Sequence, residues 1–293
     1  MKQAEIIIDK GLCQGCGYCV RFCNQNCLQF SKENYNSRGF AIVEAVAPEK
    51  CKGCGNCVQM CPHWAIQISV TSDDSKSVIT GPPHLATQPP MIGCAGCQHP
   101  TVGRILAEVI YELKYAGRAQ VLEGLPCSIS SALGTDFGTK VAPDEKVLDM
   151  AAAARLDCPS DIVVAITGYW GQSDFSFDFG GFIKTLMRGQ NLTIILCNTS
   201  FYGPRDQRPA PDAEPVEGQL EPITLIDTPT GRRLYRGGHP VHLAELAASF
   251  QGVCYSARGV LTSPKEYQVT KDYIKKACRK QADGKGLSFV EVL

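Results

Sequence analysis

The sequence predicts an α/β protein in two parts, a small cysteine-rich module followed by a larger domain built on a parallel sheet. Two observations indicate this architecture. A run of four cysteines occurs twice before residue 62, and strand-like and helix-like segments alternate after residue 93. A chain of 293 residues is also longer than most domains with a single hydrophobic core, which favours two domains. We place the module at 1–72, a linker at 73–92 and the second domain at 93–293.

The cysteine runs share the spacing C-x2-C-x2-C-x3-C, formed by Cys13, Cys16, Cys19 and Cys23 and again by Cys51, Cys54, Cys57 and Cys61. In this pattern three thiolates bind one iron–sulfur cubane, and the fourth cysteine ligates the other. The sequence therefore predicts two [4Fe-4S] clusters, one held by Cys13, Cys16, Cys19 and Cys61 and the other by Cys51, Cys54, Cys57 and Cys23. Zinc thiolate sites are the alternative, although zinc ribbons usually pair two C-x2-C knuckles at longer separation.

Each cysteine run follows a strand-like segment, at 5–9 and at 40–46, and precedes a short apolar one. Gly15, Gly17, Gly53 and Gly55 stand between the ligands, where the backbone has to turn tightly. The module is therefore a duplicated βαβ-like unit that resembles bacterial two-cluster ferredoxins. Cys27 lies outside the pattern, and we expect it to pack as an extra thiol near a cluster.

The composition narrows the functional class. The formal net charge is zero, and the lack of excess positive charge argues against a nucleic-acid partner. The chain also has 16 cysteines. Its longest apolar runs fall far short of the ~20 residues of a membrane span, and MKQAEIIIDKG is a poor signal peptide. Clustered cysteines without an export signal are typical of metal thiolates in a reducing compartment. We therefore expect a soluble cytoplasmic protein.

The second part of the chain alternates strands with helices. Residues 71–90, with four prolines, indicate an extended linker before it. Strands are predicted at 121–123, 161–167, 192–198, 253–257 and 287–293, and helices at 101–115, 179–188, 241–250 and 264–280. Such alternation favours a parallel sheet covered on both faces, with ligands beyond the carboxyl ends of its strands.

The loops at those ends carry a family resemblance. GCAGCQHPTVGRILAEVI (93–110) resembles the opening CPGCGH segment of the thiamine-diphosphate-binding subunit of 2-oxoacid:ferredoxin oxidoreductases. GLPCSIS (124–130) is similar to that family's GIGCS, RGQNLTIILCNTSFYG (188–203) to its segment ending in NNxxYG, and GLSFVEVL (286–293) to its last strand. The cysteine-rich module resembles the small ferredoxin-type subunit of 2-oxoglutarate oxidoreductases. The chain therefore resembles these two subunits fused, and a bacterial-type 2[4Fe-4S] ferredoxin domain followed by a thiamine-diphosphate-binding-type α/β domain is the implied fold.

The resemblance also implies a third [4Fe-4S] cluster, with Cys94, Cys97 and Cys127 as three of its ligands. The family's fourth ligand follows the strand that corresponds to 289–293, where this sequence ends. The open alternatives are that the sequence is truncated there, that Cys158, Cys197 or Cys254 closes the site, and that the cluster is absent.

The resemblance further implies a thiamine diphosphate site with Mg²⁺, an ion that prefers oxygen ligands. In the family an Asp in a GDG turn binds the metal, but Gly168 is followed by Tyr169 here. The downstream positions are Asn198, then Thr199 as a metal ligand and the carbonyl of Phe201.

Two further residues belong to this expected site. Asp174 is a candidate replacement for the missing metal-binding Asp, although the sequence slightly favours a solvated loop aspartate or a helix cap. His99 matches the His of CPGCGH, and the alternative is a histidine that only caps or packs. The HGR and TGGQ segments of the family have no counterpart.

Two functions from different classes follow from the resemblance. The first is an enzyme subunit for the oxidative decarboxylation of a 2-oxoacid, with coenzyme A as a substrate in many members of the family. Electrons leave through the clusters to ferredoxin or a similar acceptor, and a partner subunit supplies the pyrimidine-side domain. The second is a non-catalytic electron-transfer and scaffold paralogue whose thiamine pocket is empty or holds another ligand, motivated by the altered motifs.

Overall fold

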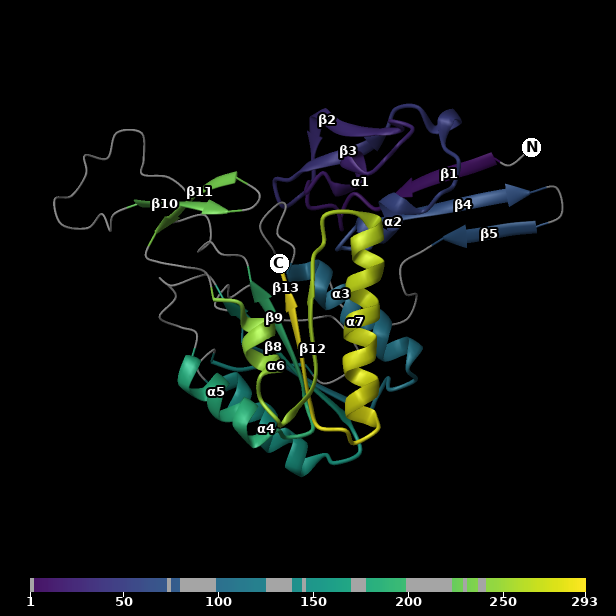
Figure 1. Ribbon diagram of the computed structural model, residues 1–293. Coiled ribbons are helices and arrows are strands. Elements are labelled where there is room, and N and C mark those ends of the chain that lie inside the picture. Colours follow the sequence, from purple (N-terminus) through teal and green to yellow (C-terminus); the bar gives the residue numbers. More distant parts are fainter. Residues whose placement is uncertain are drawn as a thin grey trace.

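The computed structural model describes residues 3–72, 75–79, 99–124, 139–143, 146–169, 178–198, 223–228, 231–236 and 241–293. Among them are a cysteine-rich module of small sheets and a larger α/β domain (Figure 1). None of the helices in these ranges is both long enough and apolar enough to cross a membrane.

The module contains two small antiparallel sheets. One has the order β1-β4-β5 and the other pairs β2 with β3. The bounds are β1 (Gln3–Ile8), β2 (Leu28–Tyr35), β3 (Ala41–Ala45), β4 (Ile66–Ser72), β5 (Ser75–Ile79), α1 (Tyr18–Arg21), α2 (Asn56–Met60) and the 3₁₀ turn Pro48–Lys50. Strands β1 and β3 confirm the predicted segments at 5–9 and 40–46. Strand β5 lies in the segment expected to be an extended linker, and it pairs with β4 over its whole length.

The α/β domain is built on one parallel sheet. In the described residues it has six strands in the order β12-β13-β9-β8-β6-β7, and all five strand pairs are parallel. The bounds are β6 (Ala119–Gly124), β7 (Thr139–Val141), β8 (Ile162–Tyr169), β9 (Thr193–Asn198), β12 (Val253–Gly259) and β13 (Leu287–Val292). A separate hairpin joins β10 (Ile223–Thr228) to β11 (Gly231–Arg236). The parallel sheet confirms the predicted fold class.

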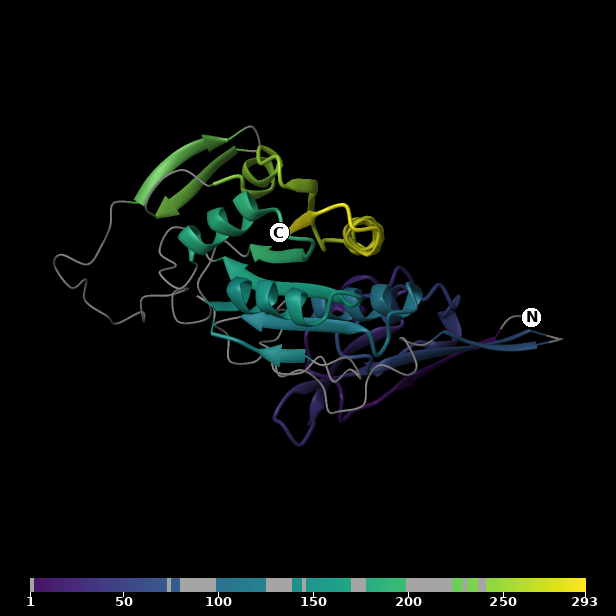
Figure 2. The ribbon, with the colours of Figure 1, turned by 90° about the horizontal axis from the view of Figure 1, so that it is seen from below.

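Helices cover both faces of this sheet (Figure 2). On one face pack α3 (His99–Glu112) and α7 (Pro264–Ala282), and on the other α4 (Val147–Asp157), α5 (Phe179–Arg188) and α6 (Leu243–Ala248). Because side chains alternate along a strand, Val164 of β8 points into the first core and Val163 into the second. Burial of the strands on both faces explains their continuous apolar sequences.

Side-chain caps mark the first turns of α5 and α7. The Asp178 carboxylate accepts a hydrogen bond from the Gly181 N–H at 2.8 Å at the start of α5. The Ser263 hydroxyl accepts one from the Glu266 N–H at 3.2 Å at the start of α7, whose first residue is Pro264. Both arrangements satisfy amides that have no intrahelical partner.

The module packs on the α3–α7 face of the α/β domain (Figure 1). Met60 of α2 is 1% exposed and belongs to the same core as the buried residues of α3 and α7. Tyr18, Phe22 and Trp64 pack against that core from the module side. The Gln59 side chain also donates a hydrogen bond to the Pro264 carbonyl at 3.2 Å, at the start of α7. The two parts therefore share one continuous hydrophobic core.

Candidate functional site

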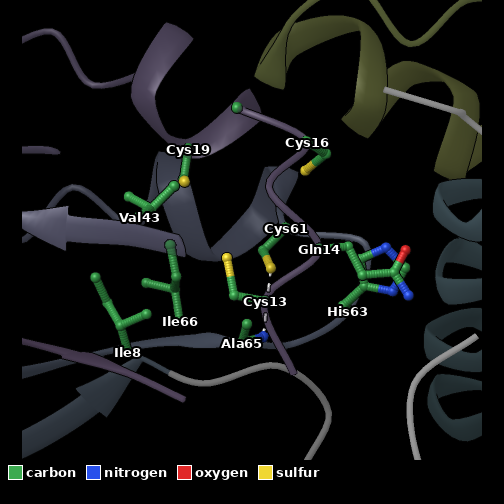
Figure 3. Close-up of a pocket in the computed structure, with 11 residues that line it drawn as sticks. Ile8, Cys13, Gln14, Cys16, Cys19, Val43, Cys61, His63, Ala65 and Ile66 are labelled. Atoms are coloured by element: carbon green, nitrogen blue, oxygen red, sulfur yellow. Dashed lines mark hydrogen bonds between the residues drawn. The ribbon is translucent and has the colours of Figure 1, made fainter. Parts of the chain in front are cut away.

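A small cavity in the module gathers four of the predicted cluster ligands. Cys13, Cys16, Cys19 and Cys61 line it, together with apolar residues such as Ile8, Val43 and Ile66. Figure 3 shows the four sulfur atoms around a common space, with Gln14 and His63 to one side. This is the ligand set that the spacing predicts for one cubane, in which the last cysteine comes from the second run.

The other four predicted ligands also lie together. Burial raises the pKa of Cys57 to about 12, and the neighbouring thiols of Cys23, Cys54 and Cys51 add to this effect. Burial likewise raises the pKa of Cys19 far above its usual range, with Cys61, Cys16, Cys13 and Cys57 as the neighbouring thiols that contribute. The chain thus places its eight motif cysteines in two adjoining groups.

The raised pKa values mean that these thiols resist ionisation when no metal is bound to them. Burial raises the pKa of Cys16 to about 11, and it raises the pKa of Cys61 with the Arg104 guanidinium as the largest opposing influence. Metal binding requires thiolates, so a bound cation has to compensate for their burial. The Ala65 N–H donates to Cys61 Sγ at 3.3 Å, which favours the thiolate form. These features suit an iron–sulfur cluster.

Cys27 lies beside the second group. It is 1% exposed, and its N–H donates to Cys23 Sγ at 3.3 Å. Burial raises the pKa of Cys27 to about 11, and Cys23 and Cys51 add to the effect. It therefore packs as an extra thiol near the group, as predicted.

Gly15 lets the first cysteine run turn tightly against β3. Its φ is +60°, and a Cβ there would lie 2.6 Å from the Ala41 carbonyl oxygen. Gly39 has a φ of +79° but no atom within 4 Å of the same position. Both glycines avoid the left-handed strain of an L-residue, but only Gly15 is needed for close approach.

We expect Gly15→Ala to lower the free energy of unfolding by ~1–3 kcal/mol more than Gly39→Ala, because only the first change forces two backbone segments apart. Iron retention after mild heating of the two anaerobically reconstituted variants measures the difference. Equal iron loss in both variants would show that the close approach does not matter.

The carboxyl edge of the parallel sheet brings several predicted cofactor residues together. In the strand register Gly168 faces Cys197 and Tyr169 faces Asn198, so the ends of β8 and β9 meet as expected. The Asn198 amide donates a hydrogen bond to the Glu291 carboxylate at 2.8 Å. Thr199, Phe201 and Asp174 lie outside the described residues.

Glu291 organises this edge from β13. It is 1% exposed, and besides Asn198 it accepts hydrogen bonds from the Ala244 N–H at 3.1 Å and from Arg258 Nε at 2.9 Å. Arg258 also pairs with Glu245 on α6. The carboxylate therefore fixes the orientation of the Asn198 side chain through a buried charged network. Sequence reasoning missed Glu291, which looks like one polar residue in a buried strand.

In α3 and β6, three described side chains have a buried polar atom without a partner: His99, Thr101 and Glu123. His99, the first residue of α3, has no partner at Nε2, and burial lowers its pKa to about 4. Glu123, near the end of β6, has no partner at Oε2, and burial raises its pKa to about 8. Because α3 runs back along the sheet before β6 begins, both residues lie toward the carboxyl edge. A buried polar atom without a partner is costly and often marks a ligand site.

Glu123→Gln is expected to stabilise the protein at alkaline pH and to change little near pH 4.5. The folded-state pKa of Glu123 lies above its ordinary value, so wild-type stability falls as pH rises from about 4.5 through about 8. A neutral amide removes this loss, which amounts to a few kcal/mol for such a shift. Thermal unfolding of both proteins between pH 5 and 9 measures the difference, and parallel Tm profiles would contradict the assignment.

The remaining predicted cysteines divide by position. Cys94, Cys97 and Cys127 lie outside the described residues. Of the three candidates for the fourth ligand, Cys158 follows α4 and Cys254 is the second residue of β12, so both lie at the amino edge of the sheet, opposite the end of β6. Cys254 Sγ contacts Ser288 Oγ at 3.5 Å. Cys197, on β9 near the carboxyl edge, is 2% exposed.

Comparisons with known proteins agree with this geometry. A 4Fe-4S dicluster domain matches residues 12–65, which contain both cysteine runs. Ketoisovalerate oxidoreductase subunit VorA of Methanothermobacter thermautotrophicus is 30% identical over 207 residues, covering 68% of this chain and 40% of that subunit. The 2-oxoglutarate synthase subunit KorB of Archaeoglobus fulgidus is 29% identical over 210 residues, covering 70% of this chain and 69% of that subunit.

The chain thus spans about two fifths of the length of the VorA subunit. Among solved structures, 2-oxoglutarate:ferredoxin oxidoreductase from Magnetococcus marinus superposes with a TM-score of 0.48 and 18% identity, over 71% of this chain and 65% of that one. In sequence the chain is thus similar to subunits of a ketoisovalerate oxidoreductase and a 2-oxoglutarate synthase, and its residues 12–65 match a 4Fe-4S dicluster domain.

Proposed function

We propose that the chain is the electron-carrying subunit of a complex that decarboxylates a 2-oxoacid oxidatively. The observation that carries this proposal is the grouping of the motif cysteines into two sets, packed directly against the α/β domain. Its sequence relatives are subunits of ketoisovalerate and 2-oxoglutarate oxidoreductases. We propose a cytoplasmic location, because low-potential clusters and free thiols need a reducing compartment.

The two proposed clusters form a route with a defined direction. Cys13, Cys16, Cys19 and Cys61 would hold the first cluster, and Cys51, Cys54, Cys57 and Cys23 the second. The first set touches the α/β domain through Cys61, whose carbonyl accepts a hydrogen bond from Arg104 of α3. The second set includes Cys54, which is exposed. Electrons would enter at the first cluster and leave at the second, to ferredoxin or a similar acceptor that docks beside Cys54.

The α/β domain would hold the diphosphate side of thiamine diphosphate at its carboxyl edge. When bound, this cofactor supplies the carbanion chemistry that cleaves a 2-oxoacid. Gly168 and Tyr169 end β8, while Glu291 holds Asn198 in one orientation beside them. His99 contributes an unpartnered nitrogen toward the same edge.

Five further assignments complete the proposal. Thr199 and Asp174 are proposed for Mg²⁺ and Phe201 for a backbone contact, and Cys94, Cys97 and Cys127 for a third cluster between the thiamine and the module. A partner subunit would supply the pyrimidine-side domain, and coenzyme A is the proposed second substrate.

A non-catalytic scaffold is the second candidate. Tyr169 stands where the resemblance places the metal-binding Asp, and a phenol is a poor ligand for Mg²⁺. On this alternative the module still transfers electrons, but the carboxyl edge is empty or binds another ligand.

The composition of the native complex separates the two candidates. Anaerobic purification followed by iron, sulfide, magnesium and thiamine diphosphate analysis per chain gives the necessary counts. About twelve iron atoms with one thiamine diphosphate would support three cubanes and catalysis. About eight iron atoms without thiamine would favour the scaffold, and zinc in place of iron would contradict both.

A further inference from the structure

A buried arginine joins the two parts of the protein. Arg104 lies in α3 of the α/β domain and is 2% exposed, yet its guanidinium reaches the module. Its Nη1 donates a hydrogen bond to the Val58 carbonyl at 2.6 Å and another to the Cys61 carbonyl. Each carbonyl also accepts a longer backbone hydrogen bond, Val58 from the Cys61 N–H at 3.4 Å and Cys61 from the Trp64 N–H at 3.5 Å, so the guanidinium adds a second donor to both. One of them belongs to a proposed cluster ligand.

Arg104 is also the first member of a chain of alternating charges. Its Nε pairs with the Glu108 carboxylate at 3.0 Å, and Lys271 pairs with Glu108 at 2.7 Å and with Glu112 at 2.7 Å. Lys275 closes the series at Glu112. Tyr267 donates to Glu108 at 3.1 Å from α7. Among the described residues, the carboxylate paired with this cation is therefore Glu108, which lies on α3 itself and not in the module.

We propose that Arg104 is a positioning residue that raises the reduction potential of the cluster bound by Cys61 and fixes that cluster against the α/β domain. This inference rests on the proposed ligand set. A [4Fe-4S] cluster that accepts one electron becomes one charge more negative, and a nearby buried cation stabilises the reduced form more than the oxidised one. Net charge and hydrogen bonding around the thiolates are among the factors that set cluster potentials.

The neighbouring charges predict opposite effects from two substitutions. Arg104→Gln removes the cation next to Cys61 but leaves the carboxylate of Glu108. Glu108→Gln removes that carboxylate and leaves the guanidinium, whose Nε can still donate to the new amide oxygen. We therefore expect the first change to lower the potential of one cluster and the second to raise it. Arg104→Lys keeps the charge but loses the forked geometry, so its potential should stay close to that of the wild type.

The experiment is an EPR-monitored redox titration of the intact, anaerobically purified protein, with dithionite as the one-electron donor through mediator dyes. Iron is first counted in every sample. Arg188→Gln and Asp149→Asn are matched controls, because they remove the two halves of an exposed ion pair of 3.6 Å on α5 and α4. In Arg104→Gln the ratio of reduced to oxidised cluster at the wild-type midpoint should fall about tenfold, equal to ~59 mV for a one-electron couple.

Each outcome decides the proposal. A fall for Arg104→Gln and a rise for Glu108→Gln in the same cluster, with unchanged controls, supports it. Wild-type potentials in an iron-replete Arg104→Gln protein overturn it. If Arg104→Gln loses iron, Glu108→Gln decides alone, and wild-type potentials there overturn the proposal. Wild-type protein that holds no cubanes overturns the ligand assignment, whereas a full iron count with unshifted potentials overturns only the role of Arg104.

Discussion

Cys19→Ala is expected to remove one cluster, which is about four of the roughly eight iron atoms of the module. The segments that line the cavity of that cluster should then lose their ordered structure. The thiol of Cys19 is 6% exposed and lies among the other three of its set. With one ligand gone, the thiols of Cys16 and Cys61 regain protons, because burial raises the pKa of both. Iron and sulfide analysis, with EPR of the reduced protein, gives the number of clusters left.

Cys27→Ala is the matched control for this change. Cys27 is as deeply buried, in the same hydrophobic core, but lies outside the ligand pattern. It should keep both clusters and lose only the packing of a small apolar side chain, ~1 kcal/mol. If both variants lose the same amount of iron, burial rather than ligation explains the effect, and the ligand assignment is wrong.

Glu291→Ala is expected to lower the free energy of unfolding by ~3–5 kcal/mol, because it leaves the Asn198 amide and the Ala244 N–H without their acceptor and removes one of the two carboxylate partners of the partly buried Arg258. For a domain of this size the loss corresponds to a fall in Tm of ~6–20 °C. Differential scanning calorimetry under anaerobic conditions measures it. The same variant should also bind thiamine diphosphate more weakly in the assembled complex, since Asn198 is no longer oriented.

Glu245→Ala removes the other partner of the same arginine and serves as the control. The Glu245 side chain is 62% exposed, whereas that of Glu291 is 1% exposed. Exposed ion pairs contribute ~0–1 kcal/mol, so this Tm should change by only a few degrees. A comparable Tm for Glu245→Ala and Glu291→Ala would show that the buried carboxylate is not the centre of the network.

The parts of the fold that depend on local sequence were predictable. The cysteine spacing determines which thiols can reach one cubane, and the strongly apolar strands β8, β9 and β13 are recognisable because both of their faces are buried. Helix α4 was missed, since its run of alanines lacks a clear apolar face. Strand β5 was missed because its polar residues 75–77 resemble a linker, and only pairing with β4 makes it a strand.

The candidate site was predictable to a lesser degree. The resemblance identified Asn198 and His99, but nothing in the local sequence shows that Glu291 lies beside Asn198, 93 residues away along the chain. The same is true of Arg104, whose acceptors lie 46 and 43 residues earlier. The role of a lone charged residue in an apolar segment can be recognised only when the fold shows which group it pairs with. Such long-range pairs cannot be derived from spacing.

The position of β13 determines when the α/β domain can fold during synthesis. Although β13 follows β12 along the chain, it lies between β9 and β12 in the sheet. Until it leaves the ribosome, β9 has an open edge and β12 lacks its partner among the described strands. The module, whose strands all lie before residue 80, is by then complete and can already receive its iron. We therefore expect nascent chains that end before β13 to expose the unpaired backbone groups of a strand edge, which can pair with other chains, and to depend on chaperones. Their ferredoxin-type module should already be folded.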